Sequence, residues 1–303
     1  MKILKTEQYI NEKLGIKPIL KSRLDSLRNE PYIADADIRE FIEEKNLVWN
    51  PKTLKYDSKG GIKVDERIVV DGQLAIKFGK IDGNFNCGDC GLISLKGSPD
   101  EVGESFYCHH NKITSLEGAP QKVMMDFICG QNEELVSLEG APQKVGGDFN
   151  CEISKKLTSI KGATQDVGKN FICKICSLTS LEGAPQKIIG NFDCCYNKLK
   201  SLKGAPQEVV GNFKCDNNKL VTLNGAPKEV GGGFQCGSNE LTSLKGSPQR
   251  IGGNFGCSEN NLTTLEGAPQ EVGGDFYCMD NWYLDLPSRK PKWIRGKFKH
   301  DKR

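Results

Sequence analysis

Apolar positions recur with a fixed period along most of the chain. Ten Phe residues are each followed two residues later by Cys, and successive Phe residues are 21 residues apart, with two steps of 22. A short, constant period is typical of solenoids, in which each repeat is one turn that packs on its neighbours. We call each repeat a rung and number the rungs from one to ten by their Phe: Phe85, Phe106, Phe127, Phe149, Phe171, Phe192, Phe213, Phe234, Phe255 and Phe276.

Rung nine shows the complete pattern, which is Phe255-x-Cys257-x-x-Asn260-x-Leu262. Alternate residues of a strand face opposite ways, so the pattern predicts a strand with Phe and Cys inside and the residue between them outside. The return path carries Gly-Ala-Pro and Gly-Gly and is too short for a full helix, so we expect extended or 3₁₀ segments there. Stacked rungs would then form one parallel sheet.

The spacing L-x-L-x-x-N/C-x-L is the leucine-rich-repeat signature, and here Phe and Cys stand in the first two Leu places. Over about two thirds of its length the chain resembles that superfamily, and its Gly-Ala-Pro and Gly-Gly-x-Phe-x-Cys rungs are similar to repeats encoded by tailed phages and some bacteria. Ser154 departs from the Asn/Cys position, and rungs three, four and ten delay the next Leu by one residue, so bulges or loosened turns are expected there. The Asn/Cys position holds Asn111, Asn132, Asn197, Asn218, Asn239, Asn260, Asn281, Cys90 and Cys176.

The resemblance implies a mainly β, leucine-rich-repeat-like solenoid with a parallel concave sheet and no convex helices. A β-helix closed by several sheets is the rival architecture, and the Asn/Cys ladder favours the leucine-rich alternative. Each Asn is expected to bond backbone groups of neighbouring turns, which a tight bend would otherwise bury without partners.

Three segments are predicted. Residues 1–60 form a helical N-terminal cap, with one helix from Thr6 toward Leu14 and another after Asp35 that places Ile38 and Phe41 on one face. Residues 61–287 form the solenoid. Residues 288–303 form a basic C-terminal tail that offers mobile charge.

The chain's thirteen Cys include two C-x-x-C pairs, Cys87/Cys90 and Cys173/Cys176, with the spacing of zinc half-sites. The repeat already accounts for both pairs. They lie four rungs apart, about 19 Å at strand spacing, which excludes one shared zinc site. We therefore expect no metal or cofactor and mostly buried, reduced thiols. Cys195 falls outside both Cys positions and is expected to face outward and react first.

Catalysis is not expected. His109, His110 and His300 are the only histidines, and no base and orienting group accompany a nucleophile. The Gly-Gly-Asp/Asn steps before Phe resemble calcium-binding turns, but their period differs, so we assign them to turns. No small-molecule substrate is predicted.

Charge adds little outside the C-terminus. Eight of the 42 basic residues lie between 289 and 303, where Asp301 is the only acid, so the rest of the chain is slightly acidic. Trp293 and Phe298 interleave with these cations, which keeps nucleic-acid binding as an alternative. The sequence has no apolar run long enough for a membrane span and no secretory signal, so the expected location is cytoplasmic, in the host if the chain is phage-encoded.

The outward residues of the strands and of the bend that follows them predict a binding face over rungs two to six. Exposed apolar and aromatic side chains on a rigid frame mark contact sites, so we predict that the chain binds another protein there, as an inhibitor of a host protein if the phage resemblance holds. Alternatives are packing of the N-terminal segment over this face, nucleic-acid binding and a structural subunit. The predicted face comprises Tyr107, His109, His110, Ile128, Ile153, Ile172, Lys174, Ile175 and Tyr196.

Overall fold

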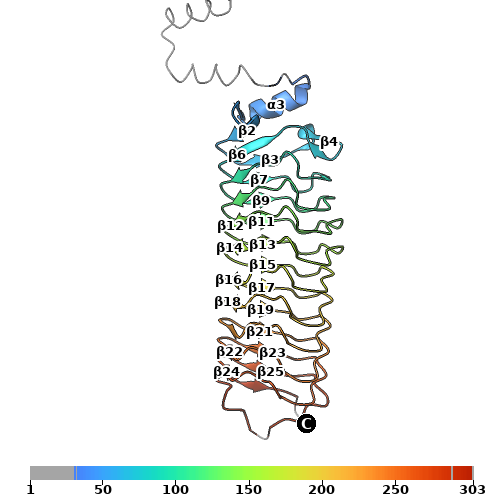
Figure 1. Ribbon diagram of the computed structural model, residues 1–303, viewed down its shortest axis with the longest axis vertical. Helices are drawn as coiled ribbons and strands as arrows, with labels where there is room; N and C mark the ends of the chain where they lie inside the picture. Colours follow the sequence, from blue (N-terminus) through green and yellow to red (C-terminus); the bar gives the residue numbers. More distant parts are fainter. Residues whose placement is uncertain (1–30, 32, 288, 302–303) are drawn as a thin grey trace, which may run out of the picture.

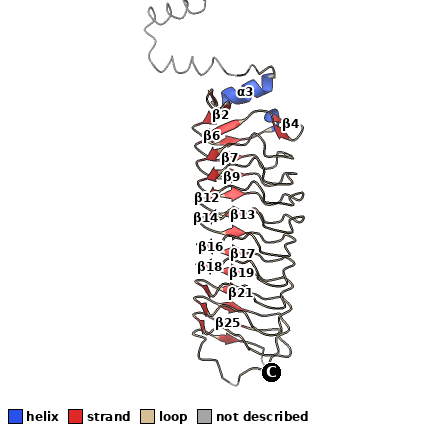
Figure 2. Ribbon diagram, viewed as in Figure 1, coloured by secondary structure: helices blue, strands red, loops and turns tan. Residues whose placement is uncertain are grey.

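The structure is a computed structural model that describes residues 31, 33–287 and 289–301. Its turns stack into one long column, with helix α3 (Ala36–Glu44) at one end and the last strand at the other (Figure 1). Most of each turn is loop, and the strands are short (Figure 2). No helix within the described part of the chain is both long and apolar enough to cross a membrane.

The main sheet has twelve parallel strands and runs the length of the column. We call it the Phe sheet because each rung contributes its Phe and the next residue, with Phe aligned on Phe in adjacent strands, as in the pair Phe192 and Phe213. A strand is added at each end of the ten rungs. The strands are β3 (Ile62–Lys63), β7 (Phe85–Asn86), β9 (Phe106–Tyr107), β11 (Phe127–Ile128), β13 (Phe149–Asn150), β15 (Phe171–Ile172), β17 (Phe192–Asp193), β19 (Phe213–Lys214), β21 (Phe234–Gln235), β23 (Phe255–Gly256), β25 (Phe276–Tyr277) and β26 (Phe298–Lys299).

The core is a column of aromatic rings. All ten rung Phe side chains are fully buried, and neighbouring ring centroids lie 5.0 to 5.7 Å apart. Ladders of buried Cys and Leu flank the rings, as Cys215 and Leu220 do in rung seven. The predicted register, with Phe and Cys inside, is therefore confirmed.

The return path adds a second strand to each turn. The Val or Ile that precedes Phe by four residues points into the core, and its strand pairs in parallel with that of the next turn, as Val102 does with Val123. These strands form two sheets. The first begins with two strands that precede the rungs, β1 (Val48–Asn50) and β2 (Lys55–Ser58), and continues with β6 (Phe78–Ile81), β8 (Glu101–Val102), β10 (Lys122–Val123), β12 (Lys144–Val145) and β14 (Asp166–Val167). The second comprises β16 (Lys187–Ile188), β18 (Glu208–Val209), β20 (Glu229–Val230), β22 (Arg250–Ile251) and β24 (Glu271–Val272).

No helix interrupts the described rungs, so the predicted mainly β solenoid with a parallel sheet and no convex helices is present. The sequence indicated only an extended return path, and the second parallel face is a feature that it shares with the rival β-helix. In rungs three, four and ten the delayed Leu bonds back to its own rung, as Leu135 N does to Asn132 O at 3.1 Å. The loosened turns expected there are present.

An Asn ladder ties successive rungs together. The side-chain Nδ2 of Asn218 donates to the carbonyl oxygens of Cys194 in the preceding rung and Cys215 in its own rung, at 3.0 and 3.1 Å. Its Oδ1 accepts the backbone N–H of Leu199 at 3.1 Å. The other ladder asparagines bond two Cys carbonyls in the same way, which confirms their predicted role.

The N-terminal end differs in part from the predicted helical cap. The helix expected after Asp35 is α3, and the Asp35 carboxylate accepts the N–H groups of Asp37 and Ile38 at 2.9 and 3.1 Å. The next residues form an antiparallel hairpin of β1 and β2, because Trp49 and Tyr56 alternate inward and β2 joins β6. The helix predicted from Thr6 toward Leu14 lies outside the described residues.

A small projection follows the cap. It consists of the 3₁₀ turn η1 (Glu66–Ile68) and the antiparallel strands β4 (Val69–Val70) and β5 (Gln73–Leu74).

The C-terminal segment is a further rung rather than a mobile tail, so that prediction is corrected. Phe298 pairs with Phe276 across β25 and β26, and the buried Ile294 bridges Val272. The Trp293 ring packs edge-on against Phe276 with centroids 5.2 Å apart. Phe298 follows Phe276 by 22 residues, a spacing that the rungs themselves use, so these apolar residues continue the repeat despite the surrounding cations.

Candidate functional site

The residues between Phe and Cys form a column on the outer face of the Phe sheet. Tyr107, Ile128 and Ile172 lie there half-buried, as their strand positions predict. Ile128 aligns with Tyr107 on one side but with Asn150 on the other, and Asn150 separates it from Ile172. This column is therefore not a continuous apolar surface.

A second column contains backbone in the left-handed region. The residue before each Asn-ladder position has a positive φ, between 50° and 59° across the ten rungs. Asp, Asn and other short polar residues tolerate this conformation best, whereas a β-branched residue there is strained. Seven rungs place Asp89, His110, Gln131, Asn217, Ser238, Glu259 and Asp280 in this column.

Three consecutive rungs break that rule. Ile153, Ile175 and Tyr196 adopt φ values of 59°, 54° and 57° in rungs four to six. Ile153 is half-buried, whereas Ile175 is 37% exposed and Tyr196 is 56% exposed, so burial does not compensate for the strain at the latter two. We call these three residues the left-handed stripe. An unfavourable backbone position occupied by exposed apolar side chains is a feature that functional sites often show.

His109 and His110 of rung two form a separate cluster with Asp89 of rung one. His110 Nδ1 lies 3.0 Å from Asp89 Oδ1, and His109 Nε2 lies 3.5 Å from Asp89 Oδ2. The His109 ring packs edge-on against Tyr107, with centroids 6.3 Å apart. Gln131 of rung three stands between this cluster and the left-handed stripe, so the predicted face contains two groups rather than one.

Lys174 is paired with a neighbouring acid. Its Nζ lies 3.1 Å from Glu152 Oε2, and this contact raises the pKa of the Lys174 ammonium. Glu152 and Lys174 directly precede Ile153 and Ile175 in the sequence. Lys174 therefore borders the left-handed stripe but its charge is largely committed to Glu152.

Cys195 is not the exposed thiol that the sequence predicts. Its side chain is 7% exposed, and its Sγ lies 3.5 Å from Asp216 Oδ2 in the next rung. Burial raises the pKa of this thiol well above its usual range, and the carboxylates of Asp193 and Asp216 raise it further. The prediction failed because Asp216 of the next rung packs against the sulfur, a contact that residue spacing does not reveal.

The other cysteines follow the repeat. Twelve of the thirteen are buried, and Cys90 is the partly exposed one. Burial raises the pKa of the ladder thiols well above the usual range, as at Cys215 and Cys236. Within the described ranges, no group of three or more His, Cys, Asp and Glu side chains is arranged to hold a metal ion.

A shallow hollow of about 580 Å³ lies on the outer face of the Phe sheet over rungs six to ten. Gly237, Gly256 and Ser258 line it with little side-chain volume, and Tyr196 and Tyr277 stand toward its two ends. Of the predicted face, only Tyr196 lines it. The sequence signal was the small residues that fill successive outward positions of rungs eight and nine.

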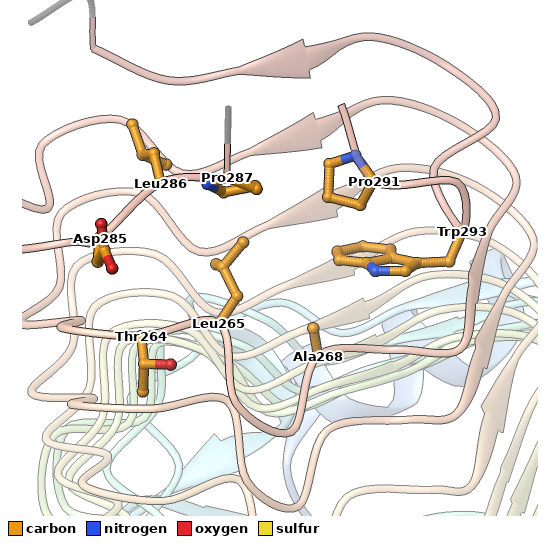
Figure 3. A pocket seen from close by; sticks show the side chains of 8 residues that line it. All are labelled: Thr264, Leu265, Ala268, Asp285, Leu286, Pro287, Pro291 and Trp293. Carbon is orange, nitrogen blue, oxygen red and sulfur yellow. The ribbon is translucent and has the colours of Figure 1, made fainter. Parts of the chain in front are cut away.

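Another hollow, of about 390 Å³, lies at the C-terminal end (Figure 3). Leu265, Pro291 and Trp293 give it an apolar lining, and Thr264 and Asp285 supply its polar side chains. These groups offer apolar contact, a hydroxyl that can donate and accept, and a carboxylate that can accept. They do not form an arrangement of nucleophile and base.

Several cations of the C-terminal segment are already paired. Arg295 forms an ion pair with Glu271, and Lys299 Nζ lies 3.4 Å from Asp275 Oδ2 and 4.5 Å from the Tyr277 ring centroid. Trp293 and Phe298 pack on Phe276, so these two rings are engaged within the fold.

No protein-family model and no curated protein sequence matches the chain. Among solved structures, the chain is similar to YopM from Yersinia enterocolitica WA-314, at 14% sequence identity and a TM-score of 0.44. The match covers 79% of this chain and 55% of that one, so the chain spans about half the length of the structure that it matches.

Proposed function

We propose that this protein is a non-catalytic binding module that recognises another protein through the left-handed stripe and the adjoining outer face of the Phe sheet. The stripe supplies the apolar contact, and Tyr107, Ile128 and Ile172 extend it toward rung two. The stacked rungs supply a rigid frame, which lowers the ordering cost of association.

One observation carries the proposal. Ile153, Ile175 and Tyr196 occupy a backbone conformation that disfavours Ile and Tyr, at positions where seven other rungs place polar residues. Neither stability nor solubility accounts for apolar residues at these positions, because a polar residue would favour both. A contact with an apolar partner surface does account for it, since large side chains on a fixed scaffold produce binding hot spots.

The alternative in which the N-terminal segment covers this face concerns residues 1–30, which lie outside the described ranges. Among the described residues, Ile175 and Tyr196 are left exposed. Our proposal assigns this exposed surface to a partner.

Two finer features belong to the same proposal. The partner is a host protein that the module inhibits, and the module acts in the cytoplasm. Both rest on the similarity of the Gly-Ala-Pro and Gly-Gly-x-Phe-x-Cys rungs to phage repeats and on the free thiols. The inhibition can be tested by adding the purified module to a lysate fraction that contains the captured partner. The activity of that partner is then assayed.

Comparative capture tests the binding proposal. The bait would be the wild-type chain, the double variant Ile175→Asn/Tyr196→Asn, and the control Ser238→Asn/Asp280→Asn. Asn is favoured in the left-handed region, so the fold should tolerate all four substitutions. The two pairs introduce the same residue at equivalent positions.

We expect a protein that co-purifies with the wild type and the control but is lost with the stripe variant. Equal recovery on all three baits would contradict the proposal. A ligand that is removed by nuclease treatment would instead support nucleic-acid binding.

A further inference from the structure

The Asn ladder is interrupted in the middle of the solenoid. Rung four has Ser154 and rung five has Cys176 where rungs three and six have Asn132 and Asn197. The Ser154 hydroxyl is buried and has no hydrogen-bond partner in the structure. This break places a thiol where an amide normally joins two rungs.

Cys176 takes over one contact of the missing amide, the one to the strand Cys of the preceding rung. Its Sγ lies 3.4 Å from the carbonyl oxygen of Cys151, the strand Cys of the preceding rung. The backbone of Ser154 and Ile153 also lies close enough to lower the pKa of the Cys176 thiol. The sulfur therefore sits between rungs four and five.

The same position brings two thiols together. The Cys151 Sγ points toward rung five, where it lies 3.6 Å from Ile172 O, and its thiol interacts with that of Cys176 strongly enough to shift the pKa of both. In the ladder positions held by Asn, an amide occupies the place of the second sulfur. Cys90, the other Cys in the ladder, lies 3.8 Å from the carbonyl oxygen of Val64, and Val64 stands where the preceding turn would have its strand Cys.

We propose that Cys151 and Cys176 are a modification site at which oxidation forms a disulfide between rungs four and five. The inference does not depend on the proposed binding function. Sequence spacing alone would favour Cys173 and Cys176, a C-x-x-C pair within one rung. The structure instead pairs Cys176 with a residue 25 positions earlier in the chain.

The two thiols have different roles in the reaction. The bond from Cys151 and the N–H groups of Ser154 and Ile153 lower the pKa of Cys176, whereas the pKa of Cys151 is raised. Cys176 is 8% exposed and Cys151 is fully buried. Because the thiolate is the nucleophile, Cys176 is the residue that reacts first.

The oxidant is a low-molecular-weight disulfide such as oxidised glutathione. The Cys176 thiolate attacks one of its sulfurs, which forms a mixed disulfide and releases one small thiol. Cys151 loses its proton to solvent and attacks Cys176 Sγ, which forms the protein disulfide and releases the second small thiol. Two protein thiols are oxidised while one small disulfide is reduced.

Equilibration of the folded full-length chain in a glutathione redox buffer tests the site. Free thiols would then be alkylated and the disulfide-linked peptides identified by mass spectrometry. We expect one linkage per chain, between the peptides that contain Cys151 and Cys176, and a mass lower by two hydrogens. The circular dichroism spectrum should stay native.

Two variants test whether the linkage depends on the position of Cys176 next to Cys151 or only on the reactivity of its thiol. Cys176→Asn restores the ladder residue, so it should fold and form no linkage, whereas Cys173→Ala removes only the C-x-x-C partner and should oxidise like the wild type. A linkage between Cys173 and Cys176 would overturn the proposal. So would a folded wild type that stays fully reduced under buffers that oxidise a reference dithiol peptide.

Discussion

The side chain of Asn218 donates to the backbone carbonyl of Cys194 one rung earlier, at 3.0 Å. Both residues are buried, so the contact satisfies a carbonyl that water cannot reach. Repetition of this bond along the column explains how turns with very short strands remain in register.

Asn218→Ala should destabilise the protein by about 2 to 3 kcal/mol, because it leaves two carbonyl oxygens and the N–H of Leu199 buried without this partner. Urea denaturation monitored by circular dichroism would measure the loss. The matched control is Asn261→Ala, at an exposed position of rung nine, which should change stability by less than about 0.5 kcal/mol. Equal effects of the two substitutions would contradict the ladder's role.

Phe213→Ala should cost about 3 to 5 kcal/mol, because truncation of a buried aromatic leaves a cavity. The Phe213 ring lies 5.2 Å from both Phe192 and Phe234, so the cavity would interrupt the ring column. Denaturation of this variant beside Lys214→Ala, which changes the exposed neighbour, checks the expectation. A small loss for Phe213→Ala would mean that the ring column does not carry the core.

Ile175→Asn should stabilise the protein by about 1 kcal/mol, which is unusual for loss of an apolar side chain. The gain comes from relief of a positive φ that is costly for a β-branched residue. Thermal denaturation would show a higher midpoint than wild type. Val221→Asn, a control at an exposed aliphatic residue outside the left-handed column, should show no gain. A destabilised Ile175→Asn would indicate that Ile175 serves the fold rather than a partner.

Stability should fall as the pH rises above about 8.5, the usual pKa of a free Cys. The buried ladder thiols have folded-state pKa values well above that range, as at Cys129 and Cys257. Such groups contribute stability that is fully present below the unfolded pKa. Above it the unfolded chain ionises and the native chain does not, so the free energy of unfolding decreases. Urea denaturation at a series of pH values from 7 to about 9.5 would detect this loss, and a flat profile would contradict the buried ladder.

Sequence periodicity predicted the Phe sheet, the buried Cys and the Asn ladder, because all three follow from residues that repeat in fixed register. It failed where neighbouring rungs determine the environment. The burial of Cys195 depends on Asp216 in the next rung, and the final rung was missed because Phe298 stands among cations. The strain at Ile153 and Ile175 could not be inferred from residue type, since it depends on the backbone conformation of the bend. The residues of the predicted binding face stay a prediction.

The affinity of the captured partner for matched variants tests the proposed binding surface most directly. Dissociation constants would be measured at physiological ionic strength for the wild type, for Ile175→Asn/Tyr196→Asn and for Lys292→Gln/Lys297→Gln. The last variant neutralises exposed cations of the final rung and leaves its packing in place. We predict at least a tenfold loss for the stripe variant, or about 1.4 kcal/mol, and a change under about twofold for the charge variant. A partner that tolerates the stripe variant but is lost with the charge variant would contradict the account.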